Sequence, residues 1–273
     1  MAKLKDITDS ESLIEYLKAK GCNHNYYYHY TTWESLEKII KYRTFLLTRG
    51  NALTINDQHE AKMKGNQEVW DRTYIGSFSH GSSENMAMWG LYGLPWKDAI
   101  RICIPKKEMI EWFNSIDTIY VWDENREIGP INTFEKTLAD IVYIYGTKDD
   151  SSFTLTQAFN NVTKKNTGSF RKLDEQKEMT GYIKNYAWRY ENEVRLKIKL
   201  NQSVNTEKIC IHLPQSIIDS IKITTGPCFV WKNSELYERF MNENRISESG
   251  FKNLVNYRDL CSLCEHESFS RKK

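Results

Sequence analysis

The stretch YYYHYTTWESLEKII, residues 26–40, predicts how the main sheet of this protein begins. Aromatic and β-branched side chains pack well on a half-buried pleated surface, so Tyr26–Thr32 is predicted to be a strand. Apolar residues then recur at helical spacing from Leu36 to Ile40, directly after Thr32, which is a typical helix-capping residue. We therefore expect a strand that runs straight into an amphipathic helix.

His29 is the residue of this strand whose charge changes near neutral pH. We expect it near the carboxyl end of the strand, among tyrosines that can stack or hydrogen-bond. An ionisable ring in such surroundings is suited to hold a nucleotide. The alternative is a histidine that is satisfied inside an aromatic core.

The composition is that of an ordered globular protein. Of the 273 residues, 40% are hydrophobic, 27% are charged and 13% are aromatic. The net charge of +2 means that steering towards nucleic acid must come from a local patch. Residues 1–6 lack the apolar core of a signal peptide, and no apolar run is long enough to cross a bilayer. We expect a cytoplasmic protein without a membrane partner.

Alternating apolar stretches predict further strands, and helical spacing between them predicts helices. The predicted strands are Thr44–Thr48, Tyr74–Ser79, Ile100–Ile104, Ile141–Tyr145, Glu193–Leu200, Ile209–Leu213 and Ile221–Thr224. The predicted helices span residues 8–20, 85–93, 106–115, 214–219 and 234–244. Strands and helices mixed in this way indicate the α+β class.

Two pairs of polar residues stand on these strands. Ser77 and Ser79 share one face of their strand. Glu191 and Glu193, two residues apart at the start of another strand, are expected to point to one side together with Arg195. Side chains from distant strands can converge on one cleft. The alternative is a pair of solvated glutamates at a strand edge, bonded to Arg195.

Two further clusters fall in the polar parts of the chain. The basic run that includes Lys164, Lys165, Arg171 and Lys172 is the best candidate for contacts with a phosphate backbone, and its alternative is a solvated face. Cys261 and Cys264 have the spacing of metal ligands, but a second ligand pair at the expected distance is missing. No metal site is therefore predicted. The sequence also lacks the glycine-rich dinucleotide and phosphate-loop motifs, the zinc-protease motif and the serine-hydrolase elbow.

The order of the motifs resembles a widespread bacterial domain family, which is itself similar to the His-Tyr-Glu branch of the ADP-ribosyltransferase superfamily. The likeness spans roughly residues 26 to 227. In chain order the motifs are Tyr28-His29-Tyr30-Thr31-Thr32, Asn56-Asp57 with Glu60, Ser77-Phe78-Ser79, Met88-Trp89 with Tyr92, and Glu191-x-Glu193-x-Arg195.

This resemblance implies a split, mixed β-sheet with flanking helices and with NAD as co-substrate in the cleft. Residues 1–240 would form one catalytic domain, and residues 241–273 a helical, charged tail. The implied activity is mono-ADP-ribosyl transfer, in a toxin or phage-defence effector that a protein antitoxin would neutralise. We expect nucleic acid, RNA before DNA, as the acceptor. The alternatives are an NAD glycohydrolase, a protein-directed transferase and a catalytically silent nucleotide-binding domain.

The resemblance also assigns roles to the motif residues. Glu193 would be catalytic, because a carboxylate stabilises the positive charge that develops on the ribose when nicotinamide leaves. Glu191 would orient or deprotonate the acceptor. An acceptor base is expected to stack on Trp89, Tyr92 or Trp188. The residues expected to contact NAD are His29, Tyr30, Thr31, Asn56, Ser77, Ser79, Trp89 and Tyr92.

Overall fold

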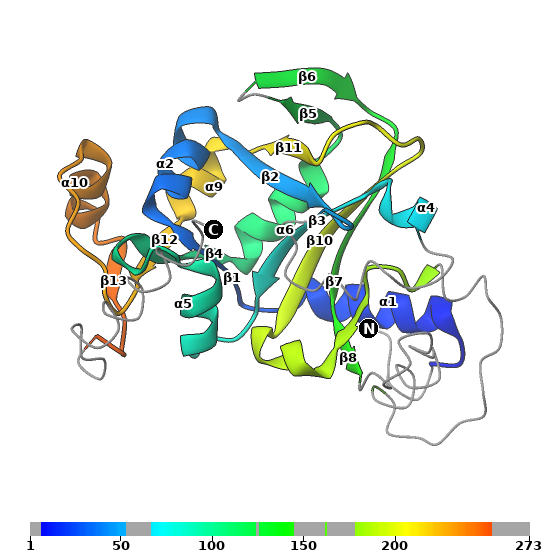
Figure 1. Ribbon diagram of the computed structural model, residues 1–273, viewed down its shortest axis with the longest axis horizontal. Coiled ribbons are helices and arrows are strands. Elements are labelled where there is room, and N and C mark those ends of the chain that lie inside the picture. The colour runs from blue at the N-terminus through cyan, green and yellow to red at the C-terminus, as the bar shows by residue number, and fades with distance from the viewer. Residues whose placement is uncertain (1–6, 53–66, 124–125, 145–161, 163–177, 253–273) are drawn as a thin grey trace, which may run out of the picture.

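The computed structural model describes residues 7–52, 67–123, 126–144, 162 and 178–252. One large mixed sheet forms the centre, and helices pack around it (Figure 1), which confirms the α+β class. Within the described ranges, no helix combines the length and the apolar character that crossing a lipid bilayer requires.

Within the described residues, the large sheet has eleven strands. They are β1 Tyr26–Thr32, β2 Thr44–Arg49, β3 Thr73–Ser79, β4 Ala99–Pro105, β5 Ile119–Asp123, β6 Arg126–Ile131, β7 Phe134–Asp140, β10 Glu193–Leu200, β11 Lys208–His212, β12 Lys222–Thr225 and β13 Ile246–Glu248. A separate parallel pair consists of β8 Val142–Ile144 and β9 Ile183–Asn185.

The helices lie between and beside these strands. They are α1 Ser10–Gly21, α2 Trp33–Tyr42, α4 Gln67–Trp70, α5 Met86–Tyr92, α6 Lys106–Ser115, α9 Gln215–Ser220 and α10 Glu235–Asn242, with the 3₁₀ turns η2 Trp96–Asp98 and η3 Tyr186–Glu191. The predicted bounds of α6 and β10 are confirmed to the residue. So is the change from strand to helix at Thr32, whose hydroxyl accepts a hydrogen bond from the amide of Ser35.

The sheet forks at β3. The strand order runs β13-β12-β4-β1-β3-β2-β11-β5-β6, and β10 pairs with β3 and β7. One edge of β3 is shared, because Ser79 pairs with Tyr28 of β1 while Ile75 pairs with Thr48 of β2. In the described residues, Tyr28 and Ser79 are the only register pair between β1 and β3. The two neighbours therefore leave β3 at different points and open a gap beside its centre.

The main core fills the space between the sheet and the helices α2, α6, α9 and α10. Its largest buried side chains include Trp33, Trp112 and Phe240. A second cluster packs α1 against β7 and β8, and a third holds α5 against β1 through Tyr30 and Trp89. Figure 1 shows α1 beside β7 and β8 and α5 beside β1. The gap in the sheet is thus framed by rigidly packed elements.

The sheet continues past residue 240. That predicted boundary falls inside α10, which ends at Asn242. Strand β13 then pairs in parallel with β12, with Ile223 opposite Ile246. The described residues beyond α10 therefore belong to the edge of the same sheet.

The close contact between α1 and β7 predicts that a side chain at Gly21 destabilises the fold. A Cβ atom at this position would lie 2.5 Å from the Cα of Ala139 and 2.7 Å from its carbonyl carbon. Because backbone cannot move aside cheaply, Gly21→Ala should lower the free energy of unfolding by about 2 kcal/mol, in the range typical of overpacking. Urea denaturation measures this change.

Gly90→Ala is the matched control. Gly90 lies inside α5, and the nearest atom to its added Cβ is on Trp96 at 3.6 Å, an ordinary contact distance. Alanine is the better helix former by about 0.5–1 kcal/mol, so this variant should be slightly more stable. Equal stability changes in the two variants would contradict the described packing of α1.

Candidate functional site

A cleft of about 60 Å³ lies beside the point where β1 leaves β3. It is lined by β1, β3, α5 and the turn before β10. We call it the site cleft, and its lining residues are Tyr28, His29, Tyr30, Ser77, Phe78, Ser79, Met88, Tyr92, Glu191 and Glu193. The structure therefore brings together seven of the predicted cofactor and catalytic residues: His29, Tyr30, Ser77, Ser79, Tyr92, Glu191 and Glu193.

A second cavity, of about 200 Å³, lies on the other side of His29. We call it the adjoining cavity. It is lined by residues of β1, α2 and β2 together with Trp122 of β5: His29, Thr31, Ser35, Lys38, Ile39, Tyr42, Thr44, Phe45, Leu46 and Trp122. Thr31, predicted to contact the cofactor, thus lines this cavity and not the site cleft. His29 is the residue common to both.

Glu191 and Glu193 converge, but not because they share a strand face. Glu191 ends the η3 turn, and Asn192 then adopts the left-handed conformation with φ 45°. Glu193 is the first residue of β10. Strand alternation therefore does not extend back to Glu191. The two carboxylates meet through Lys184 of β9, whose Nζ donates to Glu191 Oε2 at 2.5 Å and to Glu193 Oε2 at 3.2 Å.

Glu193 is 2% exposed and is surrounded by donors. Arg195 donates from Nε to Oε1 at 2.8 Å and from Nη2 to Oε2 at 3.0 Å, and the Ser77 hydroxyl donates to Oε1 at 2.5 Å. Burial alone would raise the pKa of Glu193, but the charges of Arg195 and Lys184 and these hydrogen bonds hold it far below its usual range. Glu193 therefore stays ionised.

Glu191 is 3% exposed, and it is pushed in the opposite direction. Burial and the negative charge of Glu193 raise its pKa, against the opposing effect of Lys184. The Tyr92 hydroxyl donates to Glu191 Oε1 at 2.6 Å. The expectation of two solvated glutamates is wrong, because segment 178–191 covers both; the bond from Glu193 to Arg195 is confirmed. A buried carboxylate pair with pKa values driven apart is suited to acid–base work.

His29 bridges the fork of the sheet. It sits in the middle of β1 and not near its carboxyl end. Its Nδ1 lies 3.0 Å from the carbonyl oxygen of Ser77 and therefore donates a hydrogen bond to it. In the described ladders, Ser77 has no register partner in β1 or β2, so the His29 ring fills that place. Burial lowers the pKa of His29 despite this bond. The ring is therefore neutral at pH 7, and its Nε2 remains an acceptor.

Other predicted residues have mixed outcomes. Tyr30 lines the site cleft and accepts a hydrogen bond from the Asn85 amide at 3.3 Å, while the Ser79 hydroxyl accepts one from the Gly81 amide. The prediction that Trp89 contacts NAD or an acceptor base is wrong. It is fully buried and its Nε1 donates to Glu84, because α5 packs this face against β1. Trp89 can neither contact NAD nor stack on a base in this arrangement.

Several predicted residues lie outside the described part of the chain. They are Asn56, with Asp57 and Glu60 of the same motif, the basic residues Lys164, Lys165, Arg171 and Lys172, and the pair Cys261 and Cys264. Two important residues were missed. Lys184 is a single lysine in a short strand, and Tyr143, whose hydroxyl accepts from the Glu193 amide at 2.8 Å, looked like an ordinary strand residue. No local sequence pattern marks either.

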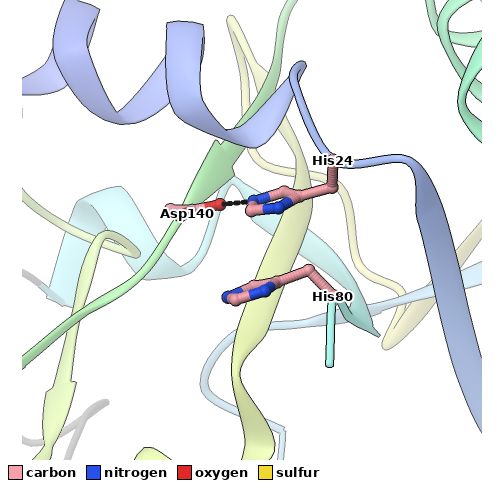
Figure 2. Close-up of side chains that lie close together, drawn as sticks. All are labelled: His24, His80 and Asp140. Atoms are coloured by element: carbon pink, nitrogen blue, oxygen red, sulfur yellow. Dashed lines mark hydrogen bonds and ion pairs between the residues drawn. The ribbon is translucent and has the colours of Figure 1, made fainter. Parts of the chain in front are cut away.

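Two histidines and an aspartate, His24, His80 and Asp140, lie close together (Figure 2). His24 Nε2 donates to Asp140 Oδ1 at 2.6 Å, and the rings of His24 and His80 stack with centroids 4.0 Å apart. Lys20 holds the other oxygen of Asp140 at 3.0 Å. The His80 amide donates to the Asn192 carbonyl, so the cluster braces the turn.

The same three residues are a metal-ligand set within the described part of the chain, since their ligand atoms lie within 4.8 Å of one another. As arranged, the lone pairs of two stacked, parallel rings do not converge on one point. The hydrogen bond between His24 Nε2 and Asp140 Oδ1 also occupies both of these atoms, so this nitrogen and this oxygen could not bind one metal together unless the bond broke. We therefore describe this cluster as a hydrogen-bonded brace.

Comparisons with known proteins identify no relative. No protein-family model, no curated protein and no solved structure matches this chain.

The burial of Glu193 predicts a large effect on stability. Glu193→Gln removes the anion between two buried cations, so the free energy of unfolding should fall by about 3 kcal/mol at pH 7, in the range found for breaking buried ion pairs. Because a lowered carboxylate pKa contributes stability only above the unfolded value of about 4.5, the deficit should shrink as pH falls below that value.

Glu191→Gln is the matched control. The charge of Glu191 is disfavoured by Glu193, so its neutralisation should cost less than about 1 kcal/mol at pH 7. Urea denaturation at pH 7 and pH 4 measures both variants. A larger loss in Glu191→Gln than in Glu193→Gln would contradict the described network.

The brace predicts a dependence of stability on pH. Burial, His24 and Lys20 lower the pKa of His80, with Asp140 opposing them. As pH falls, His80 is therefore protonated in the unfolded chain before it is protonated in the folded protein. The free energy of unfolding should then fall as pH drops below about 6.5. His80→Phe keeps a stacking ring but does not titrate, so it should flatten this fall between pH 7 and 5.

His212→Phe is the control for this measurement. His212 also stacks on a ring, that of Tyr120 at 4.7 Å, but its side chain is 54% exposed. Thermal melts across the pH range should show the wild-type slope in this variant. An unchanged slope in His80→Phe would show that the brace is not what acid weakens.

Proposed function

We propose that this protein transfers ADP-ribose from NAD to a macromolecular acceptor, and that its sheet is the split sheet of the ADP-ribosyltransferase fold. The observation that carries the proposal is the buried pair Glu191 and Glu193, with pKa values driven apart, facing His29 across a cleft at a fork in the sheet. The order of the sequence motifs supports it.

The two cavities divide the ligand between them. The site cleft, at about 60 Å³, is far smaller than typical ligand sites of roughly 300–1,000 Å³, so it can enclose only the nicotinamide end of the dinucleotide. The adenosine end would lie in the adjoining cavity. There Tyr42 and Trp122 offer rings for the base, and Lys38 offers a charge for the diphosphate. His29, between the two, would contact the ribose.

Glu193 would act by its charge. When the bond between C1′ and the nicotinamide nitrogen breaks, the electron pair leaves with neutral nicotinamide and positive charge develops on the ribose. A carboxylate that is already ionised and held by Arg195 and Lys184 needs no reorganisation to stabilise that charge. The Ser77 hydroxyl keeps its orientation towards the cleft.

Glu191 would act on the acceptor. Its raised pKa brings it closer to neutral pH, where a general base is most effective. The nucleophile of the acceptor would bond to C1′ while its proton passes to Glu191. Tyr92 and Lys184 hold the carboxylate in place for this step.

A nucleic-acid acceptor, RNA before DNA, fits the surface next to Glu191. The η3 turn that ends at Glu191 carries Tyr186, Trp188 and Tyr190, and Arg189 lies over the Tyr186 ring at 4.3 Å. Trp188 and Tyr190 are half-buried. Aromatic rings interleaved with a cation are typical of platforms on which single-stranded bases stack. Lys164, Lys165, Arg171 and Lys172 would supply phosphate contacts.

Substitution of the glutamates tests this proposal. After incubation with NAD and total RNA, mass analysis separates adduct, free ADP-ribose and intact NAD. Glu193→Gln should lower NAD turnover at least ~100-fold, the loss expected when a group aimed at transition-state charge is removed. Assays run below the melting temperature of each variant keep this loss separate from unfolding.

Glu127→Gln is the control, because this exposed glutamate pairs with His212 far along the sheet on β6. It should keep full turnover. Free ADP-ribose without adduct would favour a glycohydrolase. An ADP-ribose adduct that survives nuclease treatment but is lost with protease would favour a protein acceptor. Intact NAD with wild-type protein and every acceptor fraction would overturn the proposal.

A further inference from the structure

A third cavity, of about 300 Å³, lies along β10, the strand that begins at Glu193, but further towards its carboxyl end. We call it the β10 cavity. Its lining residues come from α1, β7, β10, the residues around β3 and segment 178–182: Ile14, Lys18, Val69, Arg72, Glu135, Thr137, Glu178, Thr180, Tyr182, Lys197 and Lys199. None of them lines the site cleft.

Lys197 is the buried amine of this cavity. The residue is 8% exposed, and its Nζ donates to the Thr180 carbonyl at 3.1 Å and lies 3.5 Å from the centre of the Tyr182 ring. In the described part of the chain, no carboxylate lies within ion-pair distance of it. A buried amine is costly to charge without a counter-ion, so an anion bound beside Lys197 would stabilise its charged form.

The other charges of the cavity do not supply that anion. Glu135 is held by Lys199 at 3.3 Å, and Glu178 accepts a hydrogen bond from the Ser10 hydroxyl at 2.8 Å. The described lining carries Lys18, Arg72, Lys197 and Lys199, and Lys18 is paired with Glu15 at 2.6 Å. Among the described residues, Arg72 and, once it is protonated, Lys197 are therefore the cations of the cavity that no carboxylate pairs with, which favours an anion as the ligand.

Thr180 provides an independent sign of a missing partner. It lines the cavity and is 3% exposed, and among the described residues its Oγ1 has no hydrogen-bond partner. Buried hydroxyls are almost always hydrogen-bonded, so an orphan of this kind needs an explanation. A bound acceptor group would provide one, since the hydroxyl can rotate to donate to it.

We propose that the β10 cavity binds a phosphoryl group, with Lys197 at its floor and Arg72, Lys18 and Lys199 around its mouth. A phosphate dianion carries the matching charge and accepts hydrogen bonds from all of these donors and from Thr180. The inference does not rest on NAD chemistry. Lys197 is four residues along β10 from Glu193, which is roughly 13 Å of extended strand.

Phosphate binding would change the protonation of Lys197. Burial lowers the pKa of Lys197 well below its usual value, and so do the charges of Arg195 and Lys199 on its own strand and of Lys18 on α1, with Glu135 on β7 opposing them. A phosphate beside the amine favours the charged form. Binding should therefore take up a proton, and affinity should fall as pH rises.

Calorimetry with inorganic phosphate tests this proposal. Titrations at pH 8 and 9.5, where free inorganic phosphate is already the dianion, each in two buffers of different ionisation enthalpy, should show one site, proton uptake and weaker binding at the higher pH. Lys197→Met keeps the length of the side chain without its amine and should weaken phosphate binding at least tenfold. Its apolar end suits a buried position, so the variant should fold.

Lys136→Met is the matched control. Burial also lowers the pKa of Lys136, but its Nζ is taken by the carbonyls of Asn114 and Ile116 and lies outside the cavity. This variant should bind phosphate as the wild type does. Titrations with adenosine monophosphate and with adenosine then show which group is recognised. If the phosphoryl group is recognised, only adenosine monophosphate binds; if the nucleoside is recognised, adenosine binds as well.

A second measurement uses the wild-type protein alone. Pyridoxal 5′-phosphate carries both a phosphate and an aldehyde, and the aldehyde condenses with a neutral amine to an imine with release of water. Borohydride reduction fixes the product, and peptide mapping should place it on Lys197 before Lys136, with protection by inorganic phosphate. The proposal would be overturned if the wild-type protein did not bind phosphate, or if Lys197→Met bound it equally well. It would also be overturned if inorganic phosphate did not protect Lys197 from labelling.

Discussion

The ion pair between Glu193 and Arg195, with Lys184 as a third member, is the interaction on which the centre of this structure depends. All three side chains are almost completely buried. Removing them from water is expensive, and their attraction compensates only when every remaining hydrogen-bonding group is satisfied. Ser77 and the carbonyl of Gly181 complete that requirement. The network thereby ties β3, β9 and β10 and the segment at residue 181 to one point.

This constraint explains the unusual character of β10. One face of the strand carries Val194, Leu196, Ile198 and Leu200 into the main core, as alternation requires. The other face carries charged residues that are nevertheless buried, because segment 178–191 covers them. The same row of charges leads from the carboxylates at one end of the strand to the lysines of the β10 cavity at the other. Two polar sites on one strand follow from a single covered face.

The sequence predicted much of the fold because its local signals agree with the final structure. Thr32 is both a capping residue and the last residue of β1, and β10 alternates without a break, so periodicity alone located them. The fork at β3 was beyond periodicity, since it depends on which strands pair and where they separate. The implied split sheet came from the resemblance, and the finer assignment of the fold remains a proposal.

The site was predicted less completely, for physical reasons. Alternation placed Glu191 beside Glu193, yet the left-handed Asn192 separates Glu191 from the strand, and Lys184 brings the carboxylates together. Trp89 looked like a ligand-stacking residue, but it is completely buried in the core cluster that packs α5 against β1. A contact that depends on a distant partner, as that of Lys184 does, leaves no mark in the local sequence.

The most direct test of this account is a carboxyl ¹³C NMR titration of protein labelled at glutamate, with Glu191→Gln and Glu193→Gln used to assign the two resonances. The account predicts that Glu193 stays ionised down to the lowest pH at which the protein is folded. It also predicts that Glu191 titrates above the usual glutamate value of about 4.5, and that NAD shifts both resonances. If both carboxyls titrated together near 4.5 and neither responded to NAD, the account of a polarised carboxylate pair at an NAD cleft would be wrong.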